Sequence, residues 1–320
     1  MLSIRLNPHL TLSNTIPSFV GGVCLGLLSV AYTSTRNKLM PSSTPNANTI
    51  LGTIFGSYLL SFLLPSLRET SYSPISLSLP TLSLAAVSLA LGAKMGKGCT
   101  FGNGIQGLGM SSLASLAHVV TFMGTGIATA TALGRGEGVA VKGNWDVDVW
   151  GECVPLVAVA VGGIGLQYFG KLGVKRGVRE FFAGVTFASS LLLAGMGSPD
   201  NITSFLDLQT PAGWDPRVCV VMIGALAVTF PAYTILGTPV VKKSPVKEWS
   251  SRPVTPSVVG GGALFGIGWG LSGLCPGPAY VAAGFGSPVY ACVMLGTRLV
   301  IDRLWVQDGD GDGDSDKKVA

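Results

Sequence analysis

Two cysteines of the sequence lie in similar glycine-rich surroundings. Cys99 stands in the segment GAKMGKGCTFGNG, and Cys275 stands in GIGWGLSGLCPGP. In each segment glycine or proline is expected to break an apolar helix, which leaves backbone N–H groups without partners beside the cysteine. The start of a helix favours an anion, and a thiol is a weak hydrogen-bond donor with a polarizable sulfur atom. The pattern therefore favours an anion site at the two breaks, where each thiol is a weak donor and a polarizable contact for another sulfur atom.

The residues beside the two cysteines complete the predicted site. Lys94 and Lys97 precede the first cysteine, so their charges are expected to attract an anion or to lower the pKa of the thiol. Two plainer interpretations stay open: the lysines mark the edge of the membrane, and the cysteines are small packing residues. The candidate binding residues of the two segments are Cys99, Cys275, Gly98, Thr100, Gly102, Asn103, Gly104, Gly273, Pro276, Gly277 and Pro278.

Other patterns that carry chemistry are weak. The segment from Gly102 to Gly107 matches G-x-G-x-x-G, but a dinucleotide site also needs a preceding strand and a βαβ unit, and neither is expected. His9 and His118 are the only histidines, and the six cysteines lie too far apart for a zinc site or a disulfide framework. The sequence predicts no cofactor, no metal, no ATP-binding motif and no nucleic-acid partner.

The composition indicates that a membrane positions these segments. Hydrophobic residues make up 48% of the 320 residues, charged residues make up only 12%, and the mean hydropathy is +0.53. A soluble domain carries roughly 25% charged residues, so a soluble protein is disfavoured. The 45 glycines favour close helix packing and irregular backbone inside a bundle. Nine apolar runs predict helices at about 17–32, 49–64, 79–93, 112–132, 153–170, 178–196, 217–236, 257–271 and 287–301.

The two cysteine segments belong to a longer internal repeat. Cys99 and Cys275 lie 176 residues apart, and the Gly-Thr pairs at 124–125 and 296–297 lie 172 residues apart. Each half contributes four apolar runs, and one run is left between them. Because this odd helix reverses the side on which the second half starts, the halves are expected to be inverted in the membrane. The predicted units are an N-terminal segment 1–16, a first repeat 17–133, a connecting helix 153–170, a second repeat 178–303 and an acidic, disordered tail 304–320.

Basic residues are unevenly divided between the two sides that nine spans create. One side holds 16 of the 21 lysines and arginines, and the other side holds five. The positive-inside rule then places the N-terminus outside and the C-terminus in the cytosol, and a plasma membrane is expected rather than an organelle. The first run is interpreted as a retained helix rather than a signal peptide. The segment from Asp308 to Asp316 begins like a calcium loop, but the twelfth position is Val319, so a solvated tail is favoured.

Several segments resemble the YeeE/YedE sulfur-transport family over about residues 18–303. The stretches Lys97–Leu108 (KGCTFGNGIQGL) and Gly268–Ala279 (GWGLSGLCPGPA) look like its two cysteine signatures, and Gly195–Leu208 with Trp214–Val228 look like its second half. The resemblance implies a compact helical membrane protein with re-entrant helices that takes up thiosulfate or a related compound.

The resemblance also assigns roles to residues. In this family cysteines along a central path relay the anion by S–H···S contacts, and Cys99 and Cys275 match two of them. The chain departs from the family pattern at three places. Many relatives carry His at the position of Asn103 and Cys at that of Gln106, and a further cysteine in the loop after the first helix, where this chain has Arg36–Leu39.

We therefore expect an all-α polytopic membrane protein with about nine transmembrane helices, short re-entrant helices and two inverted pseudo-repeats. It is expected to be a permease rather than an enzyme, with a small sulfur-containing anion, the lipid bilayer and a cytosolic sulfur-accepting protein as partners. A membrane sulfurtransferase that carries a cysteine persulfide is the alternative, although no histidine or acid is spaced to act as its base. A membrane scaffold is a third possibility, but it leaves the two Gly-Cys segments unexplained.

Overall fold

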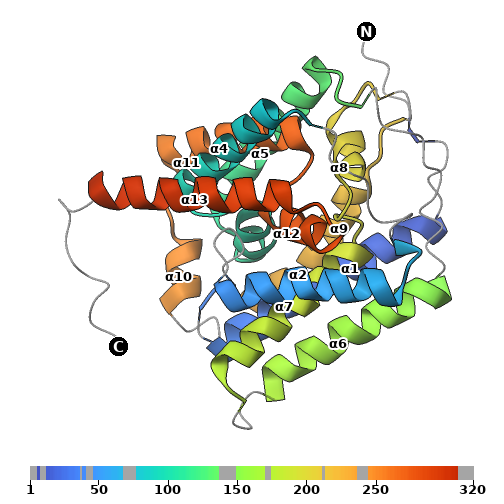
Figure 1. Ribbon diagram of the computed structural model, residues 1–320. Helices are drawn as coiled ribbons and strands as arrows, with labels where there is room; N and C mark the ends of the chain where they lie inside the picture. Colours follow the sequence, from blue (N-terminus) through green and yellow to red (C-terminus); the bar gives the residue numbers. More distant parts are fainter. Residues whose placement is uncertain are drawn as a thin grey trace.

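The computed structural model is a bundle of helices (Figure 1). In the part of the chain that it describes there is no strand, and Leu6 and Trp214 form an isolated bridge. The expected all-α fold class is therefore confirmed. The described residues are 6–7, 12–36, 38–40, 46–67, 77–136, 149–169, 174–210, 213–235 and 244–308.

The first part of the chain supplies four α-helices and one π-helix. Three of the α-helices begin at a polar cap: Asn46, Ser78 and Ser112 each accept a hydrogen bond from the backbone N–H three residues later. The elements are α1 (Leu12–Arg36), α2 (Ala47–Leu63), α4 (Leu79–Met95), η1 (Thr100–Gly107, the π-helix) and α5 (Leu113–Ala132).

The second part supplies eight described α-helices and two π-helices. Proline stands in the first turn of α8, α11 and α12, where its missing N–H costs no intrahelical hydrogen bond. The elements are η2 (Val149–Cys153), α6 (Val154–Phe169), α7 (Arg176–Leu193), α8 (Pro199–Leu206), α9 (Arg217–Phe230), η4 (Pro231–Ile235), α10 (Ser244–Ser250), α11 (Pro256–Ser272), α12 (Pro276–Gly284) and α13 (Pro288–Asp308).

The protein is a polytopic membrane protein by helix length and hydropathy. Large apolar side chains such as Phe62 and Leu113 are exposed on its surface, as lipid-facing residues are. Six described segments, rather than nine, are long and apolar enough to cross a membrane, since α2 is short and both α7 and α13 carry charged residues. The six segments are Thr15–Arg36, Leu79–Gly107, Leu113–Ala132, Gly151–Tyr168, Arg217–Thr234 and Pro256–Gly284.

Helices of the first part of the chain pack mainly on helices of the second part. Helix α1 packs on α9, and α2 packs on α7, while α4 and α11 pack on each other at the centre. In the same way α12 packs on α2, and η1 packs on α9. Helix α6 lies outside this arrangement and packs on α7 and α1. The contact of α1 with α9 thus corresponds to that of α2 with α7, and the contact of α12 with α2 corresponds to that of η1 with α9.

Glycines bring two of these helix pairs into backbone contact. A Cβ atom on Gly22 of α1 would collide with the α9 backbone, and one on Gly224 of α9 would collide with the α1 backbone. The same reciprocal contact joins Gly52 of α2 and Gly184 of α7. Such close approach is what small residues provide in membrane bundles, where apolar burial alone does not drive helix association.

The ends of the chain differ from the predicted boundaries. Helix α1 begins at Leu12, within the segment expected to precede the membrane part, and α13 continues to Asp308. The first residues of the expected tail are therefore helical. The reason is that α13 keeps apolar residues such as Leu304 and Trp305 beyond the expected end at 303. The acidic segment from 309 onward, with its calcium-like beginning, lies outside the described residues.

Candidate functional site

The two predicted helix breaks have the same backbone conformation. After α4 the chain passes through Lys97 in the left-handed region (φ 55°), and after α11 it passes through Gly273 in the same region (φ 69°). These two residues lie 176 residues apart, like the cysteines that follow them two positions later. Cys99 and Cys275 then adopt extended conformations as the N-caps of η1 and α12. Glycine enters this conformation without strain, whereas lysine does so at a cost of roughly 1 kcal/mol.

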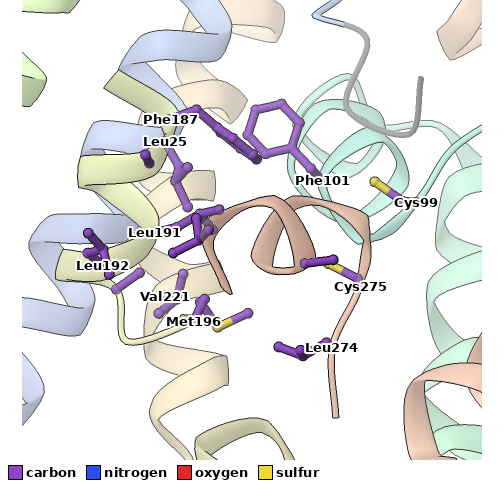
Figure 2. Close-up of a cluster of buried hydrophobic side chains, with 14 of the residues drawn as sticks. Leu25, Cys99, Phe101, Phe187, Leu191, Leu192, Met196, Val221, Leu274 and Cys275 are labelled. Carbon is purple, nitrogen blue, oxygen red and sulfur yellow. The ribbon is translucent and has the colours of Figure 1, made fainter. Parts of the chain in front are cut away.

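Both cysteines line one small cavity between the two broken helices. The cavity has a volume of about 40 Å³, and the two thiols are its sulfhydryl groups. Cys99 is 2% exposed and Cys275 is 8% exposed. Figure 2 shows both cysteines close to the apolar side chains around the start of α12. The remaining lining residues are Leu25, Thr100, Phe101, Ile105, Phe187, Leu191, Met196, Val218, Val221, Met222, Gly277 and Pro278.

The first turns of η1 and α12 supply the polar groups of this cavity. In α12, Pro276 and Pro278 have no N–H, so the N–H of Gly277 is the free donor between them, and it lies against the Cys275 sulfur. In η1, the hydroxyl of Thr100 also lies beside that sulfur, is buried, and makes no well-formed hydrogen bond. Neither cysteine side chain caps its own helix. Two helix starts and two thiols therefore converge on an otherwise apolar space.

The hydrogen bonds of the Asn103 side chain hold the turn that leads to Cys99. The Nδ2 atom of Asn103 donates to the carbonyl oxygens of Gly98 (3.0 Å) and Gly96 (3.3 Å). Its Oδ1 atom accepts from Ser115 Oγ (3.0 Å) and from Arg252 Nη2 (2.9 Å). Asn103 is completely buried and does not line the cavity. Its role in the structure is therefore to hold the helix break rather than to contact a ligand in the cavity.

A second polar group holds the turn that leads to Cys275. The Tyr290 hydroxyl of α13 donates to Ser272 Oγ (2.8 Å) and to the carbonyl oxygen of Leu274 (3.2 Å). Ser272 also donates to the Gly268 carbonyl oxygen (2.9 Å). The two breaks thus have similar backbones but are fixed by different side chains.

The other predicted site residues lie close to the cavity without lining it. Gly102 and Gly104 are buried in η1, and a Cβ atom on Gly104 would approach the Met222 side chain. Gly98 lies in the break before Cys99, where a Cβ atom would approach Asn103 Nδ2. Of the residues that the sequence predicted, the structure brings together Cys99, Cys275, Thr100, Gly277 and Pro278 at the cavity.

The two lysines lie away from the cavity. Lys94 forms an ion pair of 2.7 Å with Asp302, which also accepts from Arg298, so a carboxylate already engages its charge. Lys97 is exposed, and its left-handed conformation rather than its charge is what the helix break uses. The basic residue that the sequence left unmarked is Arg252, which lies against Asn103. No spacing rule could indicate this contact, because the two residues are separated by 149 positions.

The remaining cysteines lie elsewhere in the bundle. Cys24 is buried among apolar side chains, Cys219 is half-buried, and Cys292 is exposed. Cys153 lines a separate apolar groove between α1, α6 and α7. His118 is completely buried in α5, and its Nδ1 lies 3.0 Å from the Val258 carbonyl oxygen. Among the described residues no group of three or more potential metal ligands occurs.

Comparisons with known proteins place the chain among transporters. Residues 176–305, which include Cys275 but not Cys99, match a family of unknown function, DUF6691. A protein of Xylella fastidiosa strain Temecula1 named "Probable transporter" is 34% identical over 132 residues, which are 39% of this chain and 87% of that protein. A protein of strain 9a5c with the same name is also 34% identical over 132 residues, which are 39% of this chain and 88% of that protein.

A second "Probable transporter" of strain Temecula1 is 28% identical over 127 residues, which are 36% of this chain and 92% of that protein. No solved structure matches the chain. The relatives are matched over most of their length, and the described part of this chain holds several helices able to cross a membrane. The chain therefore belongs to the family of these probable transporters.

Proposed function

We propose that the protein is a permease for a small sulfur-containing anion such as thiosulfate, which passes between the thiols of Cys99 and Cys275. One observation carries the proposal: a single buried cavity receives both thiols and the starts of the two half-helices η1 and α12. Helix starts carry partial positive charge, and broken helices that point at a substrate are typical of transporters. The transporter names of the relatives support the same class of function.

The chemistry of the lining suits passage rather than tight binding. An anion that leaves water loses strong hydrogen bonds, and the loss is large unless donors replace them. The thiols, the Thr100 hydroxyl and the Gly277 N–H are such donors, but each is neutral and weak. Weak donors at successive points lower the barrier without trapping the ion, which is the condition for conduction. A sulfur atom of the substrate would also contact two polarizable sulfur atoms.

The size of the cavity limits the substrate. About 40 Å³ is space for roughly one to three water-sized groups. An anion of a few heavy atoms would fit with small side-chain movements, whereas an amino acid or a nucleotide would not. The cavity therefore supports a compact inorganic sulfur anion over a larger organosulfur compound.

The orientation of the path follows from the inverted halves. We propose that the cytosolic side carries most of the basic residues, so that η1 enters from the cytosolic side and α12 from the outer side. The N-terminus would then lie outside and the C-terminus in the cytosol of a plasma membrane. A cytosolic protein that consumes the sulfur would give the flow its direction.

Uptake of radioactive thiosulfate into proteoliposomes tests the proposal. Cys99→Ala and Cys275→Ala should each lower the initial rate by at least about tenfold, because each removes a donor from the desolvated path. Cys292→Ala is the matched control, since this thiol is exposed on the outer surface of the bundle, and it should transport like the wild type. Normal uptake by both cavity variants at equal protein density would refute the relay, and a stable radioactive label on a cysteine would indicate a sulfurtransferase instead.

A further inference from the structure

Arg252 lies on the opposite side of η1 from the thiol cavity. It follows α10 and precedes α11, and its guanidinium group reaches η1 and α5. The Nη2 atom donates to Asn103 Oδ1 (2.9 Å) and to Ser115 Oγ (3.1 Å), and Nη1 lies 3.5 Å from the Gly96 carbonyl oxygen. The ring of Trp249 stacks on the guanidinium group at 3.9 Å. All of these neighbours are neutral.

The charge of Arg252 has no carboxylate partner among the described residues. Other arginines at the edges of the bundle do have one: Arg36 pairs with Glu180, and Arg298 pairs with Asp302. Arg252 is half-buried, and the loss of hydration lowers its pKa to about 10. Keeping a desolvated cation without a counter-ion is costly, so such a residue is typical of a site whose counter-ion arrives from outside the chain.

The cluster also holds more polar atoms than it satisfies. The Nε atom of Arg252 is buried and has no hydrogen-bond partner. The Nε2 atom of His118 is likewise buried and without a partner, and the His118 side chain is completely buried. Both side chains meet at Gly96, since the imidazole lies against its Cα and the guanidinium group faces its carbonyl oxygen. The Nε–H of Arg252 is thus a buried donor that suits an anion, whereas His118 donates from Nδ1 to the Val258 carbonyl oxygen, so its Nε2 is an acceptor and does not add to an anion site.

We infer that Arg252 binds the transported anion at a second station, on the α10–α11 side of η1. The station consists of the Arg252 guanidinium group, the Trp249 ring and the polar side chains of Asn103 and Ser115. A guanidinium group binds oxyanions strongly because its N–H groups lie in one plane and carry positive charge. Asn103 joins the two stations, since one end of its amide contacts Arg252 and the other end holds the turn before Cys99.

This inference rests on the proposed transport of a sulfur anion. It adds a positively charged binding station at one end of the proposed path. In the proposed orientation the station lies on the cytosolic side, where the anion leaves the thiols. The anion would move from the neutral thiols to the Arg252 guanidinium group and would then dissociate into water. Lys94 and Lys97 were expected to supply this charge, but one is paired and the other is exposed.

The ring of Trp249 provides a direct measurement of binding. Purified protein in detergent is titrated with sodium thiosulfate and, separately, with sodium sulfate, while chloride holds the ionic strength constant. We expect a saturable change in tryptophan fluorescence that is absent in Trp249→Phe, because an anion at Arg252 changes the charge next to this ring. Arg252→Gln should raise the apparent Kd by at least about tenfold, and Arg252→Lys should raise it less because it keeps the charge. Arg303→Gln removes an exposed arginine of α13 and should bind like the wild type.

A second variant changes the charge around Arg252 while the arginine itself is retained. Asn103→Asp places a carboxylate beside Arg252 and should weaken anion binding at least as much as Arg252→Gln, although it strengthens the contact between the two elements. Wild-type Kd values for Arg252→Gln or Asn103→Asp would overturn the station. If thiosulfate binds in an Arg252-dependent way but is not taken up, the transport proposal is wrong and the station stands. If uptake is normal and the fluorescence change does not depend on Arg252, the station is wrong and transport stands.

Discussion

Removal of the Asn103 side chain should destabilise the protein more than its size suggests. Asn103→Ala deletes four hydrogen bonds, two donated to backbone carbonyl oxygens and two accepted from Ser115 and Arg252. Neutral hydrogen bonds in membrane proteins contribute roughly 0.6–1 kcal/mol each, and one from a charged donor contributes about 1.5–3 kcal/mol. The expected loss in the free energy of unfolding is therefore about 3–6 kcal/mol.

A matched pair of variants gives this prediction its scale. Asn201→Ala deletes a single hydrogen bond, which the side-chain amide donates to the Gly195 carbonyl oxygen at 2.9 Å. This variant should lower the free energy of unfolding by about 0.6–1 kcal/mol. Asn103→Asp keeps both accepted bonds and loses both donated ones, so its loss should lie between the two alanine variants. Reversible unfolding in mixed detergent micelles, followed by circular dichroism, measures all three. If Asn103→Ala lowered the free energy of unfolding no more than Asn201→Ala does, the four hydrogen bonds of Asn103 would contribute no more than a single one, and the reasoning would be refuted.

The two helix breaks and the hydrogen bonds that hold them give three further predictions. Lys97→Gly should raise the free energy of unfolding by roughly 1 kcal/mol by removing the left-handed strain, and it should leave the KM for uptake unchanged; a raised KM would show that the charge is used. Gly273→Ala should cost at least about 2 kcal/mol, because its φ is 69° and the new Cβ would lie 2.6 Å from Thr203 Oγ1; a melting temperature like that of the wild type would contradict this. Tyr290→Phe should speed the reaction of Cys275 with a small thiol reagent, since the turn before Cys275 loses two hydrogen bonds. An unchanged rate of labelling would show that the Tyr290 hydroxyl does not hold this turn.

Local features of the chain could be predicted from the sequence because they depend on neighbouring residues. Glycine ends α4 and α11, and proline begins α12, as the residue types favour. The spacing of 176 residues relates both the two cysteines and the left-handed residues Lys97 and Gly273. The helical fold class was predicted from composition in the same way. The number of spans stays a prediction, because α7 and α13 carry charged residues within runs that the sequence counts as apolar.

Contacts between distant residues could not be predicted. The Asn103–Arg252 contact joins η1 to the segment before α11, and the Tyr290 contact depends on how α13 folds back. Arg252 looked like one of many basic residues on one side of the membrane. Only packing distinguishes it, since it places this guanidinium group against neutral acceptors and gives Lys94 a carboxylate instead. A sequence lists charges, but the fold decides which of them remain uncompensated.

The apolar lining of the thiol cavity has a consequence for the energy supply of the cell. A small cavity whose lining is mostly apolar holds water weakly, because its few weak donors return fewer hydrogen bonds than bulk water does. Proton leakage through membranes needs a continuous file of water, and in the proposed permease a poorly hydrated segment between Cys99 and Cys275 would interrupt that file. The path would thus open to water only as part of the hydration of its own substrate. A cell could keep such a protein permanently in its membrane without dissipating the proton gradient on which its other transporters depend.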